Sequence, residues 1–387
     1  SGSIRRLAFT PEDLQARYKV QQWMIEAGMT VRTDAAGNLI GHYAGTVEGA
    51  PALVTGSHID TVPSGGRFDG VLGVLAGIEV VETLHQNHLR LKHPIEVIVF
   101  TDEENTMIGC QAIAGTLDLK DPDQLKTTVG VPIQECLERI GGNWEELATA
   151  QRSRSDMAAF VELHVEQGAV LEHQQKMIGV VQGVVGVHRL ALTLIGQANH
   201  AGTTPMDMRH DALVAASEIV LAVKSLANRI PGEPVATVGR LEVFPNAVNI
   251  VPGRVELSVD LRDLSKSCLE QMVAQLEREV NAIATTYGIR VETAPLLWVE
   301  PSLAANHIQS AIESICEDLH LSHCRLPSRA GHDALEMGRI TDMGMIFVPS
   351  QAGISHSEAE YTSPEQCTQG ANVLLHTFVE LDNAYPI

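Results

Sequence analysis

The stretch VTGSHIDTVPSGGRFDGVLGVLAG, residues 54–77, connects a predicted strand to a predicted helix through a polar loop. The apolar run 52–55 is typical of a buried strand, and the Gly, Pro and Ser residues of 63–66 are typical of a loop. After Gly70, small apolar residues recur at helical spacing. In open α/β sheets, ligands bind at the carboxyl ends of the strands, where such loops lie. The stretch brings three polar side chains into that neighbourhood: His58, Asp60 and Asp69.

These three side chains have the chemistry of a metal site. A neutral imidazole and a carboxylate are the usual protein ligands of first-row divalent metals when no thiolate is supplied. Asp60 follows His58 by two residues, so both point to the same face of a strand and the carboxylate can orient the imidazole without touching the metal. The alternative is a polar loop in which Asp60 is solvated and Asp69 caps the helix.

Composition indicates a soluble globular protein of about two domains. The chain has 387 residues, of which 44% are hydrophobic and 19% charged. Its six cysteines are scattered with no CxxC pair, which favours reduced thiols in a cytoplasm over a disulfide framework. The formal net charge of −21 predicts repulsion from nucleic acids and anionic membranes. No apolar run reaches membrane-spanning length and no signal peptide is visible, so we expect a cytoplasmic protein with neither a membrane nor a nucleic acid as partner.

A change of pattern near Gly183 predicts a second domain inserted into the first. Residues 188–197 and 254–262 alternate between apolar and polar side chains, as strands with one exposed face do. With two predicted helices and two further strands, they give the β-α-β-β-α-β order of a ferredoxin-like unit. We therefore predict the α/β fold class, with an α/β domain in two parts and an inserted domain between them: residues 1–183, 299–387 and 184–298, respectively.

Four predicted strand ends in the α/β domain carry candidate metal ligands. The strands at 52–55, 94–101, 158–168 and 343–350 deliver, in that order, His58 with Asp69, Glu103 with Glu104, His164, and His356. Each of these residues alone is more often a solvated loop residue, but together they suit two divalent ions bridged by one carboxylate. Such a pair generates hydroxide from water at neutral pH, whereas a single ion would leave ligands unused.

One carboxylate must stay off the metal as general base. Adjacent Glu103 and Glu104 fit that division, because neighbours at a strand end point in different directions. The predicted chemistry is therefore hydrolysis of a carbonyl compound.

Seven motifs resemble those of the metal-dependent M20 peptidase-type amidohydrolases: GSHIDTVPSGGRFDGVLGV, DEE, ELHVEQG, NHAGTTPM, PNAVNIVPG, AGHDA and GISH. They are spread over residues 56–356 in the order of the family, and HIDTV, HVEQG and HAGTTPM are the most specific. Within the family they look like the branch of allantoate amidohydrolase, N-carbamoyl-L-amino-acid hydrolase and β-ureidopropionase. The resemblance implies cleavage of a ureido or carbamoyl C–N bond in a small carboxylate compound, with N-carbamoyl-L-amino acids and allantoate as the two best substrates.

The resemblance also implies a role for each matching residue. The implied ligands of two divalent ions, Zn²⁺ or Mn²⁺ with Co²⁺ or Ni²⁺ as further fits, are His58, Asp69 as the bridge, His164, Glu104 and His356. Glu103 would be the general base and Asp60 would orient His58. The implied substrate-binding residues are Gln167, His200, Asn249, Arg262 and His332.

The resemblance further implies that the inserted domain is a lid and dimerisation domain. His200 would reach the active site of a neighbouring subunit, which makes the expected partner a second copy of the chain in a homodimer with a shared active site. Arg262 would hold the substrate carboxylate, because its planar fork binds such a group bidentately. Without the resemblance, Arg262 is simply a surface residue that ends a strand.

The sequence departs from this branch after Glu104, where the loop 105–110 is shorter by several residues. This loop shapes the pocket, so the departure bears on the identity of the substrate and not on hydrolysis. The alternatives are an aminoacylase or peptidase of the same superfamily, a metal-bound binding protein that has lost catalysis, and, least favoured, a structural zinc domain. The intact Glu103 argues against a binding protein, and structural zinc sites favour cysteine-rich shells.

Overall fold

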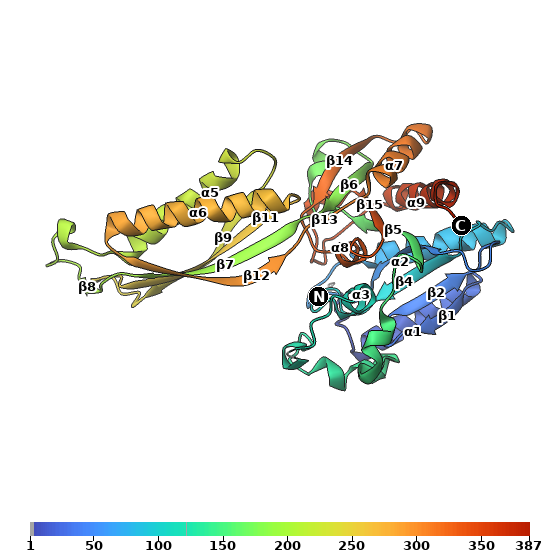
Figure 1. The fold of residues 1–387 in the computed structure, drawn as a ribbon, viewed down its shortest axis with the longest axis horizontal. Coiled ribbons are helices and arrows are strands. Elements are labelled where there is room, and N and C mark those ends of the chain that lie inside the picture. Colours follow the sequence, from blue (N-terminus) through green and yellow to red (C-terminus); the bar gives the residue numbers. More distant parts are fainter. Residues whose placement is uncertain (1–3, 121) are drawn as a thin grey trace. The chain divides into compact units, whose positions relative to one another are not determined.

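The computed structural model describes residues 4–120 and 122–387, which divide into two compact units. Unit 1 combines the two ends of the chain, Ser1–Val184 and Ser302–Ile387, and unit 2 is the intervening Val185–Pro301. Each unit has its own core of buried apolar side chains. The mixed α/β class predicted from the sequence is confirmed (Figure 1).

Unit 1 contains a mixed sheet whose central strands are parallel. Its strand order is β1-β2-β4-β3-β5-β15-β6-β13, and β14 pairs with β6. β3 runs parallel to β4 and β5, and β5 runs parallel to β15. The strands are β1 Thr30–Thr33, β2 Leu39–Tyr43, β3 Ala52–His58, β4 Ile95–Phe100, β5 Met157–Val165, β6 Ile178–Val184, β13 Ser302–Leu303, β14 His323–Ser328 and β15 Asp342–Val348.

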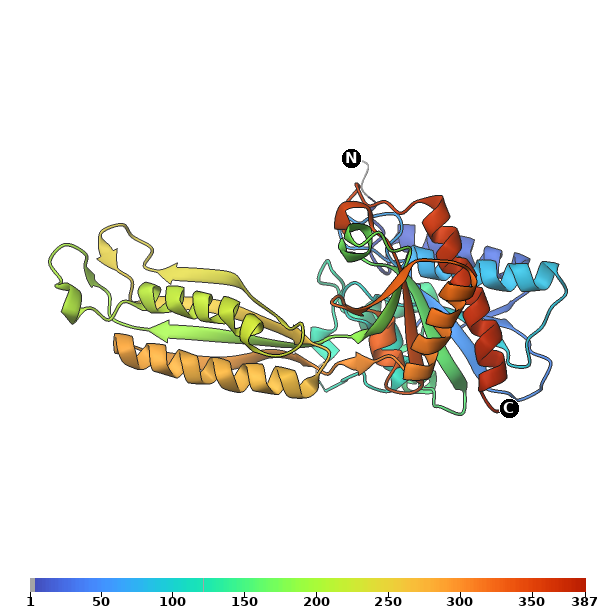
Figure 2. The same ribbon diagram turned by 90° about the horizontal axis from the view of Figure 1, so that it is seen from above.

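The helices of unit 1 cover this sheet. α2 packs with α9 over β3 and β5, and α7 joins them beside β6 and β15 (Figure 2). The side chains of β5 alternate: Val161 and Leu163 join the core under α2 and α9, whereas Glu162 contacts α8 through the Ala334 amide. The helices are α1 Pro11–Glu26, α2 Val71–Gln86, α3 Ile108–Ala114, α4 Val170–His173, α7 Asn306–Asp318, α8 Asp333–Met337 and α9 Pro364–Ala384.

In its described residues, the region 120–156 has only short 3-10 helices. They are η1 Pro122–Gln124, η2 Ile133–Glu135, η3 Leu137–Ile140 and η4 Trp144–Ala150, and a further one, η6 Gln351–Gly353, follows β15. None of the helices among the described residues has the length and apolar character needed to cross a bilayer.

Unit 2 is a four-stranded antiparallel sheet of order β12-β7-β11-β9 with two helices. In β11, alternate residues from Val255 to Leu261 are buried, and they pack against α5 and α6. α5 begins at its cap Asp211 and α6 at its cap Ser265, each of whose side chains accepts main-chain N–H groups. The elements are β7 Gly186–Ile195, β8 Asn199–His200, η5 Met206–Met208, α5 Ala212–Arg229, β9 Val235–Phe244, β10 Ile250–Val251, β11 Arg254–Asp263, α6 Lys266–Tyr287 and β12 Arg290–Val299.

Candidate metal centre

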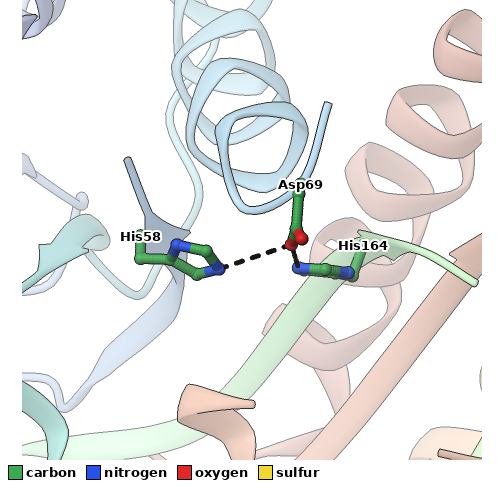
Figure 3. A group of neighbouring side chains, drawn as sticks. All are labelled: His58, Asp69 and His164. Atoms are coloured by element: carbon green, nitrogen blue, oxygen red, sulfur yellow. Dashed lines mark ion pairs between the residues drawn. The ribbon is translucent and has the colours of Figure 1, made fainter. Parts of the chain in front are cut away.

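The parallel strands of unit 1 bring the predicted ligands to one edge of the sheet. His58 is the last residue of β3, His164 lies one residue before the end of β5, and Glu103 and Glu104 follow β4. Asp69 lies two residues before α2 begins, and it stands between the two histidines (Figure 3). His356 follows β15 in a loop. Residues up to about 300 positions apart in sequence therefore meet, because the carboxyl ends of parallel strands share one edge.

Asp69 is the centre of the cluster. Its Oδ1 lies 3.6 Å from Nε2 of His58 and 3.2 Å from Nε2 of His164, as the dashed lines of Figure 3 mark. Its Oδ2 lies 3.1 Å from Nε2 of His356, which is 3.6 Å from Oε2 of Glu104. Among the described residues, three groups of ligand atoms converge within 4.8 Å. A buried one consists of Glu162, His164 and His332 and does not contain Asp69. The two that do contain Asp69 are His58, Asp69 and His164, and Asp69, Glu104 and His356. The two groups share Asp69, with one oxygen directed at each.

Main-chain carbonyls orient the two buried histidines. Nδ1 of His58 lies 3.0 Å from the carbonyl of Asp60, and Nδ1 of His164 lies 2.9 Å from the carbonyl of Val165. An Nδ1–H that donates to a carbonyl leaves the single lone pair of Nε2 as the acceptor on the side of Asp69. On His164 the Gly70 amide donates to that lone pair at 3.1 Å, so an ion bound by His164 would replace this hydrogen bond. Nε2 of His58 faces the Asp69 carboxylate, and a cation between the two would satisfy both.

The electrostatics of the centre favour a cation. Burial lowers the pKa of His58, but Glu103, Asp69 and Asp60 raise it by more, so that it lies well above its usual value. Burial also lowers the pKa of His164, but Asp69 and Glu162 together raise it by more, so it lies above its usual value. A proton and a divalent ion satisfy the same electron pairs, so residues that attract the one also attract the other. The donor set of imidazoles and carboxylates fits Zn²⁺, Mn²⁺ and related ions.

Asp60 contacts the Glu103–Glu104 loop as well as His58. Its carboxylate accepts the main-chain N–H of Glu103 at 3.4 Å and of Glu104 at 3.2 Å, and lies 3.9 Å from Nδ1 of His58. The nearest group to that nitrogen is the Asp60 carbonyl, because the carboxylate is turned toward the loop. Asp60, which follows β3, therefore connects the end of β3 to the residues that follow β4 through its side chain.

Glu103 is a buried carboxyl group beside the centre, with Oε2 at 3.5 Å from Nε2 of His58. Burial raises its pKa well above the usual value, and the charges of Asp333 and Glu104 raise it further, while His58 lowers it. A carboxylate in such surroundings gains affinity for protons, which suits a group that takes one from water.

A cavity of about 240 Å³ opens beside these residues. Besides the ligand candidates and Glu103, its lining includes Asn105, Met107, Gln167, Ala330, Gly331 and His332, so the shortened loop after Glu104 does form part of the wall.

Two of the predicted substrate-binding residues line this cavity. The Nε2 group of Gln167 donates to Oδ2 of Asp69 at 3.0 Å, and its Oε1 is buried without a partner among the described residues. His332 packs edge-on against the ring of His164, with ring centroids 4.5 Å apart, and burial lowers its pKa well below the usual value. These surroundings favour the neutral form of the His332 imidazole.

The other three predicted substrate-binding residues lie in unit 2. Exposed His200 in β8 accepts the N–H groups of Gly202 at 3.0 Å and Thr203 at 3.1 Å on Nδ1, so the neutral ring carries its proton on Nε2. The carbonyl of Asn249, beside β10, accepts the Ala201 N–H at 2.9 Å, which brings Asn249 next to His200.

Arg262 lies apart from that pair within unit 2. Arg254 is the first residue of β11, and it lies at the end of the strand that is close in sequence to Asn249 and β10. Arg262 is near the other end of β11, eight residues later, which is about 27 Å along an extended strand. Its guanidinium holds Asp260, with Nε donating to Oδ1 at 2.8 Å and Nη2 to Oδ2 at 3.3 Å. Unit 2 thus brings His200 and Asn249 together and separates them from Arg262.

Sequence reasoning assigned no role to two residues that contact the centre. Oγ of Ser355 lies 3.3 Å from Oδ2 of Asp69, and the buried Glu360 accepts the main-chain N–H of Asp69 at 3.1 Å. Both lie in the segment GISHSEAEYT, residues 353–362, in which the sequence predicts a role for His356 alone. Their polar character within a loop was not a signal, because loops are polar in general.

Comparison with known proteins agrees with the predicted family. The sequence matches the family model of "Peptidase family M20/M25/M40" over residues 54–380. An N-carbamoyl-L-amino acid amidohydrolase of Geobacillus stearothermophilus is 42% identical over 388 residues, covering 98% of this chain and 94% of that protein. The allantoate amidohydrolase of Bacillus subtilis is 34% identical over 385 residues, with 98% and 93% covered. A crystal structure of an amidase of the hydantoinase/carbamoylase family from Burkholderia multivorans has a TM-score of 0.91 at 37% identity, covering 100% of this chain and 94% of that one.

We predict that chelator-stripped protein takes up two divalent ions per chain, and that His58→Ala and His356→Ala each reduce this content, because each removes one ligand of a different group. Elemental analysis after gel filtration measures the ratio. His173→Ala, in α4 and in neither group, is the control and is expected to retain full content. Full metal content in both ligand variants would exclude the site described here.

Proposed function

Because this chain belongs to peptidase family M20/M25/M40, we propose that it is a binuclear metal-dependent amidohydrolase. It would cleave the ureido or carbamoyl C–N bond of a small carboxylate compound. The observation that carries the proposal is Asp69, whose two oxygens each face a separate group of ligand atoms. The similarity to an N-carbamoyl-L-amino acid amidohydrolase, at 42% identity over 98% of the chain, supports N-carbamoyl-L-amino acids as the first substrate class. Allantoate is the second, supported by the relative in Bacillus subtilis.

His58, Asp69 and His164 would hold one ion, and Asp69, Glu104 and His356 the other. When bound, the ions supply a water of lowered pKa and an electrophile for the substrate carbonyl. Glu103 would accept the proton of the attacking water and return it to the leaving nitrogen, for which its buried position and raised pKa are suited. Asp60 would keep Glu103 in place through its contact with the main chain at that residue.

The substrate is tested by ammonia release, because hydrolysis of a carbamoyl or ureido group liberates ammonia whereas hydrolysis of an N-acetyl group does not. We expect ammonia from a panel of N-carbamoyl-L-amino acids or from allantoate, with metal added back to stripped enzyme. The same panel contains N-acetyl amino acids and dipeptides, assayed for the free amino acid. Turnover of these alone would replace the proposal with an aminoacylase or peptidase.

The proposed role of Glu103 predicts the behaviour of Glu103→Gln. The amide keeps the size of the side chain but cannot take a proton, so we expect kcat to fall by about 10²- to 10⁴-fold while the fold and metal content are retained. Glu104→Gln is the matched comparison, because it should lose metal as well as activity. A metal-replete Glu103→Gln enzyme with nearly normal kcat would assign the base to another group.

We also propose that unit 2 is a lid and dimerisation domain that completes the active site of a second copy. The supporting observation is the separation of two residues within unit 2. Arg262 lies near one end of β11, and His200 lies past the other end of that strand, so the two are about 27 Å or more apart. This separation exceeds the length of any small carboxylate substrate. If both bind one substrate, they come from different subunits. The Nε2–H of His200 would donate to the oxygen that becomes negative in the transition state.

Complementation tests this shared site. His200→Ala and Glu103→Gln homodimers should each be nearly inactive. If His200 acts in the partner, a mixed dimer has one site with both changes and one with neither, so about half of the activity of a normal dimer should return. Mass spectrometry confirms that mixed dimers have formed. No recovery in confirmed mixed dimers would mean that His200 serves its own subunit or none.

A further inference from the structure

The orientation of Asp69 is the property on which both groups of ligand atoms depend. Asp69 supplies one oxygen to each group, so a small rotation of its side chain moves an oxygen away from one group or the other. Asp69 lies in the turn that leads into α2, and His356 lies in the loop after β15. These are separate segments of the chain. The distance between Asp69 and His356 therefore depends on the contacts that hold the two segments together.

Glu360 joins them. Its Oε1 accepts the main-chain N–H of Phe68 at 2.6 Å and of Asp69 at 3.1 Å. Its Oε2 accepts the hydroxyl of Ser355, next to His356, at 2.9 Å. One carboxylate therefore bonds to the main chain of the Asp69 turn and to the loop that carries His356. Hydrogen bonds to an ionised carboxylate are about twice as strong as those between neutral groups.

The surrounding residues are arranged around this carboxylate. Glu360 is 3% exposed, so its bonds are not shared with bulk water. A Cβ atom at Gly66 would lie 2.2 Å from Cδ of Glu360, so a side chain at residue 66 would displace the carboxylate from this position. The ring of Phe68 packs edge-on against that of Tyr361, with centroids 6.0 Å apart, which joins the same two segments a second time.

Ser355 extends the link to the ligand itself. Its hydroxyl lies 2.9 Å from Oε2 of Glu360 and 3.3 Å from Oδ2 of Asp69, and its single hydrogen can bond only one of them at a time. The shorter distance indicates that the hydroxyl donates its hydrogen bond to Oε2 of Glu360. Without Glu360, the hydroxyl would donate to Oδ2 of Asp69, and the Phe68 and Asp69 amides would lose their acceptor.

We infer that Glu360 is a positioning residue for the second group of ligand atoms, Asp69, Glu104 and His356. It holds the Asp69 turn and the His356 loop at the separation that a divalent ion requires, and it touches neither the ion nor the substrate. The inference rests on the proposed function, because it assumes that this group binds a metal. The group of His58 and His164 depends less on Glu360, because those histidines are fixed by strands β3 and β5.

The test is a titration of metal-free protein with Co²⁺ alone. Binding is monitored by calorimetry and by the visible absorption of the bound ion. Wild-type protein is expected to show two binding events. In Glu360→Ala, we expect the affinity of one of the two events to fall by about 10- to 100-fold, as is typical when a residue that orients a ligand is removed. The other event is expected to change much less, and His356→Ala, which removes a ligand of the second group, should weaken the same event as Glu360→Ala. Glu360→Gln keeps one oxygen for the Phe68 and Asp69 amides, so it should recover most of the loss.

Glu365→Ala is the matched control, because it removes an exposed carboxylate of equal charge five residues away, and its titration should equal that of the wild type. Circular dichroism melting checks that each variant is folded. If Glu360→Ala does not fold, Ser355→Ala replaces it, and a selective but smaller weakening of the same event is expected.

Equal weakening of both events, or none, in the folded variant would overturn the role of Glu360. Failure of wild-type protein to bind Co²⁺ would be a different result, since it would overturn the metal centre of the proposed function together with this inference.

Discussion

The carboxylate of Asp69, with an imidazole nitrogen facing each of its oxygens, is the contact around which unit 1 is arranged. It lies at the start of α2, where the helix dipole favours a negative charge. The chain enters that helix through Gly70 at φ 67°, and a Cβ there would lie 2.5 Å from the carbonyl of His58. Only glycine combines this backbone conformation with so close an approach, so the turn that presents Asp69 and the strand that presents His58 are fixed together.

The fold places further buried acids near this contact. Burial is the largest cause that raises the pKa of Asp60, of Glu103 and of Glu162. Each buried carboxylate would be costly alone, and the chain offsets the cost with donors: Glu162, for example, accepts the Ser57 hydroxyl at 2.8 Å and the Ala334 N–H at 2.9 Å. The charges of these carboxylates act on His58 and His164. A cation bound between the two histidines would neutralise part of this negative charge.

The local pattern of the sequence predicted the elements that carry the site. The predicted strand 94–101 corresponds to β4, Ile95–Phe100, and the helix predicted after Gly70 corresponds to α2, Val71–Gln86. Strands β6 and β14 were not predicted, and β6 pairs with β14 and β15, which lie far away in sequence. The motifs also predicted the family, which is confirmed by the match over residues 54–380.

By itself, the sequence determined which residues are candidates for metal ligands, because residue type and a place after a predicted strand can be read from it. These candidates include His58, Asp69, His164 and His356. Only the tertiary structure decided that Asp69 shares its oxygens between two groups, and that the Asp60 carboxylate turns toward the main chain of Glu103. It also decided the contacts of Glu360, whose partners lie 291 and 292 residues away along the chain. The physical reason is that a hydrogen bond depends on position and direction in space, and a polar loop residue carries no local pattern that reports its distant partner.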